Sequence, residues 1–502
     1  MKNTVRIILF AIGLSIALHF VQQISDEWLI GSFSVLFTLS IVFIGFVIFF
    51  ENRHPTQTLT WLVVLGSFPL VGFLFYLFFG QNIRKKRFFK KKAIIDEKTF
   101  AQFDKSNYSN AEKIKLMHNH QKLTFKLATT LGNSPISFHT YTKVLTNGIE
   151  TFDAIFKELE KAKHHIHLEY YIVRHDVVGQ KLKDLLIRKA KEGVQVRFLY
   201  DAVGSWRLSA KYIQELRNAG VEMVPFLPVK FPVLSDKINF RNHRKIIVVD
   251  SSVGFVGGLN IGDEYLGRNP YFGFWRDTHL LLKGEAVRSL QLIFLQDWYY
   301  MTGHKLLTED YLTTSIMPEQ EGGVQLIAGG PDNKWEIIKN LFFSMINSSV
   351  DSIWIASPYF IPDEDIKTAL KIAALSGIDV RLLVPKKPDK KIVYYASRSY
   401  FPELLEAGVK IYEYEKGFMH SKIIIVDNEL ASIGTANMDM RSFHLNFEVN
   451  AFLYRTYSVQ TLSDEFLRDI QSSHEIILSE FEKRPFFVKF IESTSRLLSP
   501  LL

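Results

Sequence analysis

The segment HSKIIIVD at residues 420–427 decides the fold, because it recurs as HRKIIVVD at residues 243–250. In both copies a His-x-Lys pair precedes four aliphatic residues and an aspartate. Each copy is followed at identical spacing by a Gly-[Gly/Thr]-x-Asn sequence, at residues 257–260 and 434–437. One copy alone would indicate an ordinary buried strand with a polar end. Two copies with equal internal spacing indicate a functional unit that is present twice.

The sequence around the two motifs repeats in the same order. The repeated segments are GVQVRFL at 193–199 with GIDVRLL at 377–383, and ELRNAGV at 215–221 with ELLEAGV at 403–409. The copies are too widely spaced for a solenoid and indicate two similar lobes. Apolar runs at 166–173 and 352–356 are typical of strands covered on both faces. The sequence therefore predicts an α/β protein with a first lobe at 134–318 and a second lobe at 319–485.

Three apolar stretches occupy the N-terminal region, at residues 7–21, 29–50 and 61–79. The second and third reach the roughly 20 residues that a bilayer span needs. The basic run RKKRFFKKK at 84–92 follows directly, and the positive-inside rule places it in the cytoplasm. Lys2 and Arg6 favour the same side, so a hairpin of two spans satisfies every charge, whereas three spans do not.

We therefore expect residues 1–83 to form a membrane segment of two or three apolar helices. Residues 84–133 would be a basic helical connector that holds anionic headgroups, with the lobes on the cytoplasmic face. The tail at 486–502 should form an amphipathic helix that packs on a lobe or lies on the membrane surface. Its predicted apolar face consists of Phe487, Phe490, Ile491, Leu497 and Leu498.

Charge and composition restrict the partners. The formal net charge of +8 favours anionic partners such as nucleic acid or acidic lipid. The absence of cysteine excludes disulfides and thiolate metal sites. His165 and His167 share one strand face without a carboxylate pattern, so we expect surface histidines there rather than a metal site.

Strand alternation sorts the residues of each motif. His420 and Lys422 project from one face and Asp427 from the other, and His243, Lys245 and Asp250 follow the same parity. An imidazole beside an ammonium group can hold one phosphate. The aspartate, on the opposite face, is better suited to anchor the structure than to act as a catalytic partner.

A two-residue turn after each motif would bring polar side chains together. Turns at 251–252 and 428–429 would place His243 opposite Asn260 and His420 opposite Asn437. The small residues beside these asparagines, which would leave room for a phosphate, are Gly257, Gly258, Gly434 and Thr435.

Two such sets suit the chemistry of a phosphodiester. Two lysines and two asparagines can neutralise its oxygens without a metal. One imidazole would attack phosphorus and the other would protonate the leaving alkoxide. Each ring also needs a hydrogen-bond acceptor on its far nitrogen, and the candidates downstream of the motifs are Asp277 and Glu448.

The doubled pattern His-x-Lys-x4-Asp-x6-Gly-[Gly/Ser/Thr]-x-Asn resembles the signature of the phospholipase D superfamily. Over nearly its whole length the chain is similar to bacterial cardiolipin synthases. The segments that carry this resemblance are 51–53, 77–80, 239–245, 262–268, 274–279, 436–442 and 497–502.

The resemblance implies two phospholipase-D-like α/β lobes related by a pseudo-twofold axis, preceded by transmembrane helices of a multi-pass bacterial cell-membrane protein. It implies phosphatidyl transfer between two phosphatidylglycerol molecules, giving cardiolipin and glycerol through a phosphatidyl-histidine, without metal or cofactor. His243 would be the nucleophile and His420 the acid and then the base. The implied catalytic set is His243, Lys245, Asp250, His420, Lys422 and Asp427. Substrate-binding residues would be Asn260, Asn437, Gly257, Gly258, Gly434 and Thr435, and Asp277 and Glu448 would orient the histidines.

Three other functions share parts of this pattern. A hydrolytic phospholipase D would differ only in using water as the acceptor. A membrane-tethered nuclease or nucleic-acid binder is disfavoured by the predicted spans, and a non-catalytic lipid scaffold by the two intact motifs. The sequence leaves open the acceptor, the acyl-chain preference and the oligomeric state.

Overall fold

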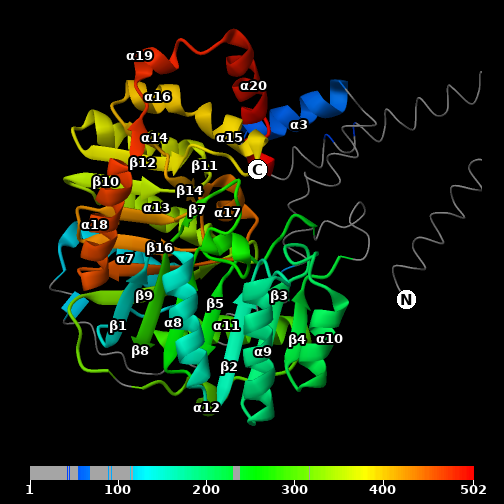
Figure 1. The fold of residues 1–502 in the computed structure, drawn as a ribbon. Helices are drawn as coiled ribbons and strands as arrows, with labels where there is room; N and C mark the ends of the chain where they lie inside the picture. Colours follow the sequence, from blue (N-terminus) through cyan, green and yellow to red (C-terminus); the bar gives the residue numbers. More distant parts are fainter. Residues whose placement is uncertain are drawn as a thin grey trace, which may run out of the picture. The chain divides into compact units, whose positions relative to one another are not determined.

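The computed structural model describes residues 42, 45, 55–67, 89, 92, 113–114, 117–229, 238–315 and 317–502. The chain divides into two compact units, residues 1–84 and 85–502, and the first contains α3 (Pro55–Ser67) (Figure 1). Among the described residues, no helix has the length and apolar character that a bilayer crossing requires. The predicted spans fall largely outside the described residues.

The first lobe is built on a seven-stranded sheet with the order β1-β8-β6-β5-β2-β3-β4. Its strands are β1 (Thr140–Leu145), β2 (His165–Tyr170), β3 (Gln195–Asp201), β4 (Glu222–Phe226), β5 (Ile246–Val249), β6 (Val253–Gly257) and β8 (His279–Gly284). The helices are α8 (Gly148–Glu160), α9 (Val177–Lys191), α10 (Ala210–Asn218) and α11 (Val287–Thr302). Three of them begin at side-chain caps, because Asn147, Asp176 and Ser209 each accept a hydrogen bond from a backbone N–H of the first turn.

The second lobe has an eight-stranded sheet with the order β19-β13-β12-β10-β15-β16-β18-β9. Its strands are β9 (Gly323–Gly329), β10 (Ser352–Ala356), β12 (Asp379–Pro385), β13 (Lys410–Tyr414), β15 (Ile423–Val426), β16 (Leu430–Gly434), β18 (Glu448–Tyr454) and β19 (Ser473–Glu475). Apart from the edge strand β19, this order repeats that of the first lobe, with β15 and β16 in the places of β5 and β6. The predicted duplication of an α/β unit is confirmed.

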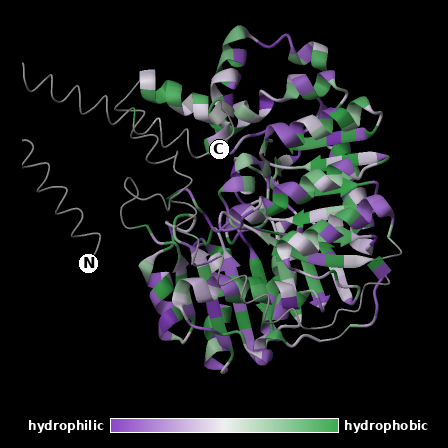
Figure 2. Ribbon diagram, turned by 180° about the vertical axis from the view of Figure 1, so that it is seen from behind, coloured by the Kyte–Doolittle hydropathy of each residue, from purple (hydrophilic) through white to green (hydrophobic). Residues whose placement is uncertain are grey.

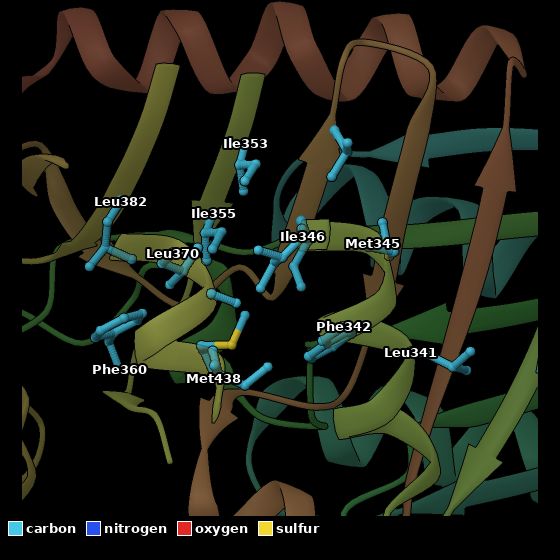
Figure 3. Packing of buried hydrophobic residues seen from close by; sticks show 14 of the residues in the cluster. Leu341, Phe342, Met345, Ile346, Ile353, Ile355, Phe360, Leu370, Leu382 and Met438 are labelled. Atoms are coloured by element: carbon cyan, nitrogen blue, oxygen red, sulfur yellow. The ribbon is translucent and has the colours of Figure 1, made fainter. Parts of the chain in front are cut away.

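The motif strands are buried on both faces, and their alternating side chains reach different cores. Ile247 of β5 packs with α8, α9 and α10, whereas Ile246 joins a cluster that contains residues of both sheets. In the second lobe, Ile423 enters this shared cluster and Ile424 the outer core. Figure 3 shows that outer core, where side chains of α13 (Ile337–Asn347) and α14 (Glu364–Leu375) meet those of β10 and β12. Much of both sheets is correspondingly hydrophobic in Figure 2.

The two lobes also pair with each other through two short strands. Outside the main sheets, β7 (Phe274–Arg276) of the first lobe pairs in parallel with β14 (Gly417–Met419) of the second. These strands lead directly into Asp277 and His420, so the pairing brings residues of the two lobes together at the motifs.

The predicted hairpin register is wrong by one residue. Val426 pairs with Leu430 and Val249 with Val253, so three residues rather than two form each loop. The two residues that follow each strand, Asp250 and Ser251 or Asp427 and Asn428, all have φ between 50° and 53°. Two successive left-handed residues let the chain reverse over a longer loop than the sequence indicated.

Three side chains that we expected on the surface are buried. Lys92, from the basic run, is 1% exposed and forms ion pairs with Asp297 at 3.0 Å and Asp332 at 3.1 Å. It therefore neutralises buried carboxylates instead of facing lipid headgroups. His165 and His167 are also buried, and both hydrogen-bond inside the protein because β2 is a central strand covered on both faces.

Candidate active site

Each motif histidine follows a point where the two lobes meet through their backbones. The His243 N–H donates to the Phe447 carbonyl oxygen at 2.9 Å, and the His420 N–H donates to that of Arg276 at 2.7 Å. In both cases the accepting residue directly precedes a candidate carboxylate of the other lobe. Each contact thus has its counterpart with the lobes exchanged, as a pseudo-twofold axis requires.

The imidazoles are held by carboxylates from opposite lobes. Nδ1 of His243 lies 3.0 Å from both carboxylate oxygens of Glu448, and Nδ1 of His420 lies 2.6 Å from Asp277 Oδ2. With Nδ1 donating to a carboxylate, Nε2 of each ring is left for a substrate. The sequence identified both carboxylates, but it did not predict that each would hold the other lobe's histidine.

Both motif lysines are buried, with exposed fractions of 0% for Lys245 and 3% for Lys422. Each ammonium donates to the carbonyl oxygen of its own motif histidine, at 2.6 Å for His243 and 2.5 Å for His420. Burial lowers the pKa of Lys245 well below its ordinary value and also lowers that of Lys422, although nearby carboxylates act in the opposite direction. A bound phosphodiester would supply the negative charge that favours both ammonium forms.

The two carboxylates differ in charge. Burial alone would raise the pKa of Asp277, but Lys422 and His420 outweigh it and hold this pKa at about 2. Burial raises the pKa of Glu448 to about 7, and Lys245 offsets burial only in part. Asp277 is therefore fully ionised at neutral pH, whereas Glu448 is close to half-protonated.

Both imidazoles are neutral at pH 7 before substrate binds. Burial and the charge of Lys245 lower the pKa of His243 well below its usual range. Burial and Lys422 lower the pKa of His420 to about 4, while Asp277 acts in the opposite direction. His420 and Lys422 also contribute to the lowered pKa of His243, which indicates that the two motifs share one electrostatic environment.

The small residues after each motif make room for protein atoms. A Cβ atom on Gly258 would lie 2.0 Å from Asp277 Oδ1. The equivalent residue in the second copy, Thr435, uses its Oγ1 to donate to Glu448 Oε2 at 2.5 Å. A Cβ atom on the preceding residue would also be too close to other atoms, at 2.5 Å from His279 Nδ1 for Gly257 and 2.3 Å from the Val449 carbonyl oxygen for Gly434. The space that we assigned to a phosphate is thus occupied by the carboxylates and their strands.

The two asparagines are tied to their surroundings. Asn260 Oδ1 accepts from the Ile172 N–H at 3.1 Å, and its Nδ2 donates to the Tyr265 hydroxyl at 3.2 Å. Asn437 Nδ2 donates to Asp439 Oδ2 at 3.1 Å. The buried Oδ1 of Asn437 has no hydrogen-bond partner among the described residues.

The motif aspartates lie at the far ends of β5 and β15 from the histidines. Asp250 accepts hydrogen bonds from the backbone N–H groups of residues 163–165, and Asp427 from those of residues 350–352. They fix the start of the neighbouring strands β2 and β10. This is the anchoring role that strand alternation favours, and it separates both residues from the reacting atoms despite their place in the predicted catalytic set.

Sequence reasoning missed Arg244, the middle residue of the first motif. Its buried guanidinium pairs with Asp297 and donates through Nε to the Glu448 carbonyl oxygen at 3.1 Å. In the second motif the equivalent Ser421 contacts Thr278 through a hydroxyl–hydroxyl hydrogen bond of 2.9 Å. The signal that could have revealed Arg244 is a second charged residue, two positions before an aliphatic strand that is buried on both faces.

The chain is similar to known proteins along its length. A family model described as "Cardiolipin synthase, PLD-like domain" matches residues 155–298 and 342–470, and "Phospholipase_D-nuclease N-terminal" matches residues 38–81. The curated cardiolipin synthases of Geobacillus sp. (strain WCH70) and Alkalihalophilus pseudofirmus are 66% and 64% identical, each over 100% of both chains. The solved phosphatidylserine synthase of Haemophilus influenzae Rd KW20 covers 77% of this chain and 100% of its own, with 16% identity and a TM-score of 0.59.

Proposed function

The chain belongs to the bacterial cardiolipin synthases of the phospholipase D superfamily, and we propose that His243 and His420 carry its phosphatidyl transfer. Cardiolipin synthases are phosphatidyltransferases, and this chain is one of them. The observation that carries the proposed roles is the exchange of carboxylates, which pairs each motif histidine with an acid of the opposite lobe.

His243 is the proposed nucleophile. Its partner Glu448 carries only a partial negative charge, since burial raises the pKa of this carboxyl to about 7. A weakly charged partner leaves the imidazole neutral, and only a neutral ring can attack phosphorus. The difference between the two carboxylates thus favours the same histidine as the family resemblance, on grounds that the sequence could not supply.

His420 is the proposed acid and base. Its partner Asp277 is fully ionised, because Lys422 and His420 hold its pKa at about 2 against the effect of burial. A full negative charge 2.6 Å from Nδ1 stabilises the imidazolium once an anionic substrate offsets the two lysines. The ring can then donate a proton and take one back.

The transfer proceeds in two steps. His243 Nε2 attacks the phosphorus of one phosphatidylglycerol, the bond to the glycerol oxygen breaks, and His420 protonates that oxygen. His420 then removes the proton from a hydroxyl of a second phosphatidylglycerol, whose oxygen attacks the phosphatidyl-histidine and releases His243. Two phosphatidylglycerol molecules thus give one cardiolipin and one glycerol, and both histidines return to their initial states.

The remaining parts of the chain follow from the same proposal. Residues 1–83 would hold the protein in the bacterial membrane as a two-span hairpin, with the lobes at 134–318 and 319–485 on the cytoplasmic face. The match of residues 38–81 to an N-terminal family model and the basic run at 84–92 support this arrangement. Anionic lipid, rather than nucleic acid, would be the partner of the positive charge.

Incubation of the purified full chain with phosphatidylglycerol alone tests the function. We expect cardiolipin and glycerol in equal amounts, measured by lipid chromatography and enzymatic glycerol assay. Phosphatidic acid as the main product would instead indicate a hydrolytic phospholipase D. No conversion would contradict both readings and leave a lipid-binding scaffold.

A further inference from the structure

The C-terminal helix α20 (Phe486–Arg496) turns its apolar side outward. Phe486, Phe487 and Phe490 are 82%, 69% and 58% exposed, and Leu497, directly after the helix, is 80% exposed. The buried side chains of α20 are instead polar, among them Glu492 at 1%. A surface helix ordinarily buries its apolar stripe, so this orientation is inverted.

Ion pairs hold α20 in this orientation. Glu492 accepts from Arg398 Nε at 3.3 Å and from Arg484 Nε at 2.8 Å. Arg496 pairs with Glu403 at 2.8 Å. Rotating the helix to bury its phenylalanines would turn Glu492 to the solvent and break both of its ion pairs. The largely buried guanidinium groups of Arg398 and Arg484 would then lose this carboxylate, which is costly. The ion pairs of the polar side therefore keep the apolar face exposed, and weak packing is not the cause.

We propose that Phe486, Phe487, Phe490 and Leu497 form a membrane foot that inserts into the lipid–water interface beside the catalytic lobes. The rings are large apolar groups on a helix whose polar side is fixed to protein, which is the arrangement of an interfacial helix. Lys483 and Lys489 lie exposed in the same segment, and their charge fits an anionic lipid surface. The occupant is thus the bilayer that holds the lipid substrate.

The foot is connected to the catalytic region through α15 (Lys391–Arg398). Arg398 bonds Glu492 of α20 and also lines a cavity with Tyr359, Asp389 and Tyr394. Tyr359 directly precedes β11 (Phe360–Ile361), which pairs in parallel with β17 (Met438–Asp439) next to Asn437, so this cavity lies beside the second motif. Docking of α20 would therefore hold the cavity at the membrane surface, where a lipid headgroup can reach it without leaving the bilayer.

A single labelled cysteine can report insertion directly, because the chain contains no cysteine. Phe490→Cys, carrying an environment-sensitive fluorophore, is compared with Tyr457→Cys, a site that is 81% exposed on α18 (Tyr457–Gln471). The full chain is reconstituted into phosphatidylglycerol vesicles. We expect the label at 490 to be quenched by spin-labelled lipid and protected from aqueous iodide, and the label at 457 to show the reverse.

Two outcomes of this measurement would overturn the proposal. Equal iodide quenching at both positions would show that the foot stays in water. Protection from iodide without quenching by lipid would show that protein covers the face, either a second copy of the chain or its own N-terminal helices.

Activity provides a second readout. Phe486→Ser, Phe487→Ser and Phe490→Ser together should lower turnover of phosphatidylglycerol in vesicles about tenfold. The same variant should retain turnover of short-chain phosphatidylglycerol presented as monomers. The matched control replaces three exposed residues elsewhere, Ile149, Val177 and Tyr457, by serine and should leave both rates unchanged. Loss on both substrates, or on neither, would contradict a foot. Failure of the wild type to form cardiolipin would refute the proposed function, yet the labelling result would stand.

Discussion

The two lobes repeat one fold, yet their imidazole–carboxylate pairs are unequal. His420 lies against an aspartate with a pKa of about 2, and His243 against a glutamate whose pKa is about 7. Both carboxylates are almost fully buried, so burial alone cannot separate them. We expect this difference to give the two histidines opposite protonation roles, because each one receives its carboxylate partner from the other lobe.

The inequality follows from how far nearby cations offset burial at each carboxylate: Lys422 and His420 outweigh burial at Asp277, whereas Lys245 does not at Glu448. The positions that follow each motif also differ. Gly258 leaves space for Asp277 to lie against the backbone, where it also accepts from the Thr278 N–H at 2.8 Å. At the equivalent place Thr435 occupies that space and donates to the longer Glu448. Asp277, whose burial is outweighed by Lys422 and His420, stays ionised, and Glu448, whose burial is offset only in part by Lys245, stays partly protonated.

Removal of either imidazole is expected to have the largest effect. His243→Ala and His420→Ala should each lower turnover of phosphatidylglycerol by about 10⁴-fold or more, because each role depends on the other. The comparison is sharpened with a phosphatidyl ester of nitrophenol, whose leaving group needs no acid. We expect His420→Ala to release nitrophenol in a burst and His243→Ala to release none. Bursts of equal size in both variants would break the assigned roles.

Neutralising the carboxylates should have the next largest effect on turnover, and the effect should differ between the two lobes. Asp277→Asn removes a full charge from His420 and is expected to lower turnover about 10³-fold, whereas Glu448→Gln removes a partial charge and should cost about tenfold. Loss of Asp277 also lowers the pKa of the His420 imidazolium, so the basic limb of the rate profile should move to lower pH. Rate measurements between pH 5 and 9 check this shift. Equal losses in both variants would indicate that the carboxylates do the same work.

The two lobes and the two carboxylates could be predicted from the sequence. The duplication of HSKIIIVD and HRKIIVVD at wide spacing predicted two lobes. Apolar runs in other strands predicted sheets that are covered on both faces, and β5 and β15 are buried in this way. Asp277 and Glu448 were found because an imidazole that changes protonation state needs an acceptor on its far nitrogen. Those inferences rest on local chemistry, which the sequence records.

The parts that sequence reasoning missed depend on packing between lobes. Which histidine each carboxylate holds is decided by the pairing of His243 with Phe447 and of His420 with Arg276, contacts between distant segments. The hairpin register failed because Asp427 adopts positive φ, a conformation that no rule for its residue type demands. Gly258 was assigned to a phosphate because an empty Cβ position does not reveal which neighbour fills it.

Substitution of Gly258 or Thr435, which contact the two carboxylates, should have a smaller effect on turnover. In Gly258→Ala the new Cβ would lie 2.0 Å from Asp277 Oδ1, and this carboxylate is held by its bond to His420, so turnover should fall about tenfold. Thr435→Ala removes one donor from Glu448 and should lower turnover only about threefold. Thr435→Ser, which keeps the hydroxyl, is the control and should stay near the wild-type rate. A larger loss at Thr435 than at Gly258 would reverse the proposed order of the two pairs.

Stability at different pH values gives the finest test, because the two carboxylates should contribute with opposite signs. The folded-state pKa of Glu448, about 7, lies above its unfolded value of 4.5, so the folded protein holds this proton more tightly, and stability falls as pH rises from 4.5 through 7. The folded-state pKa of Asp277, about 2, lies below its unfolded value of 3.8, so its contribution is complete above 3.8 and is lost only as pH falls through 2.

Glu448→Gln should therefore gain stability relative to the wild type between pH 5 and pH 8, by on the order of 3 kcal/mol at most. For Asp277→Asn, the difference in stability from the wild type should be the same at pH 5 and at pH 8. Thermal unfolding midpoints in detergent, followed by circular dichroism, measure both variants, and parallel pH dependence in the two would mean that Glu448 does not carry the raised pKa on which the unequal pairs rest.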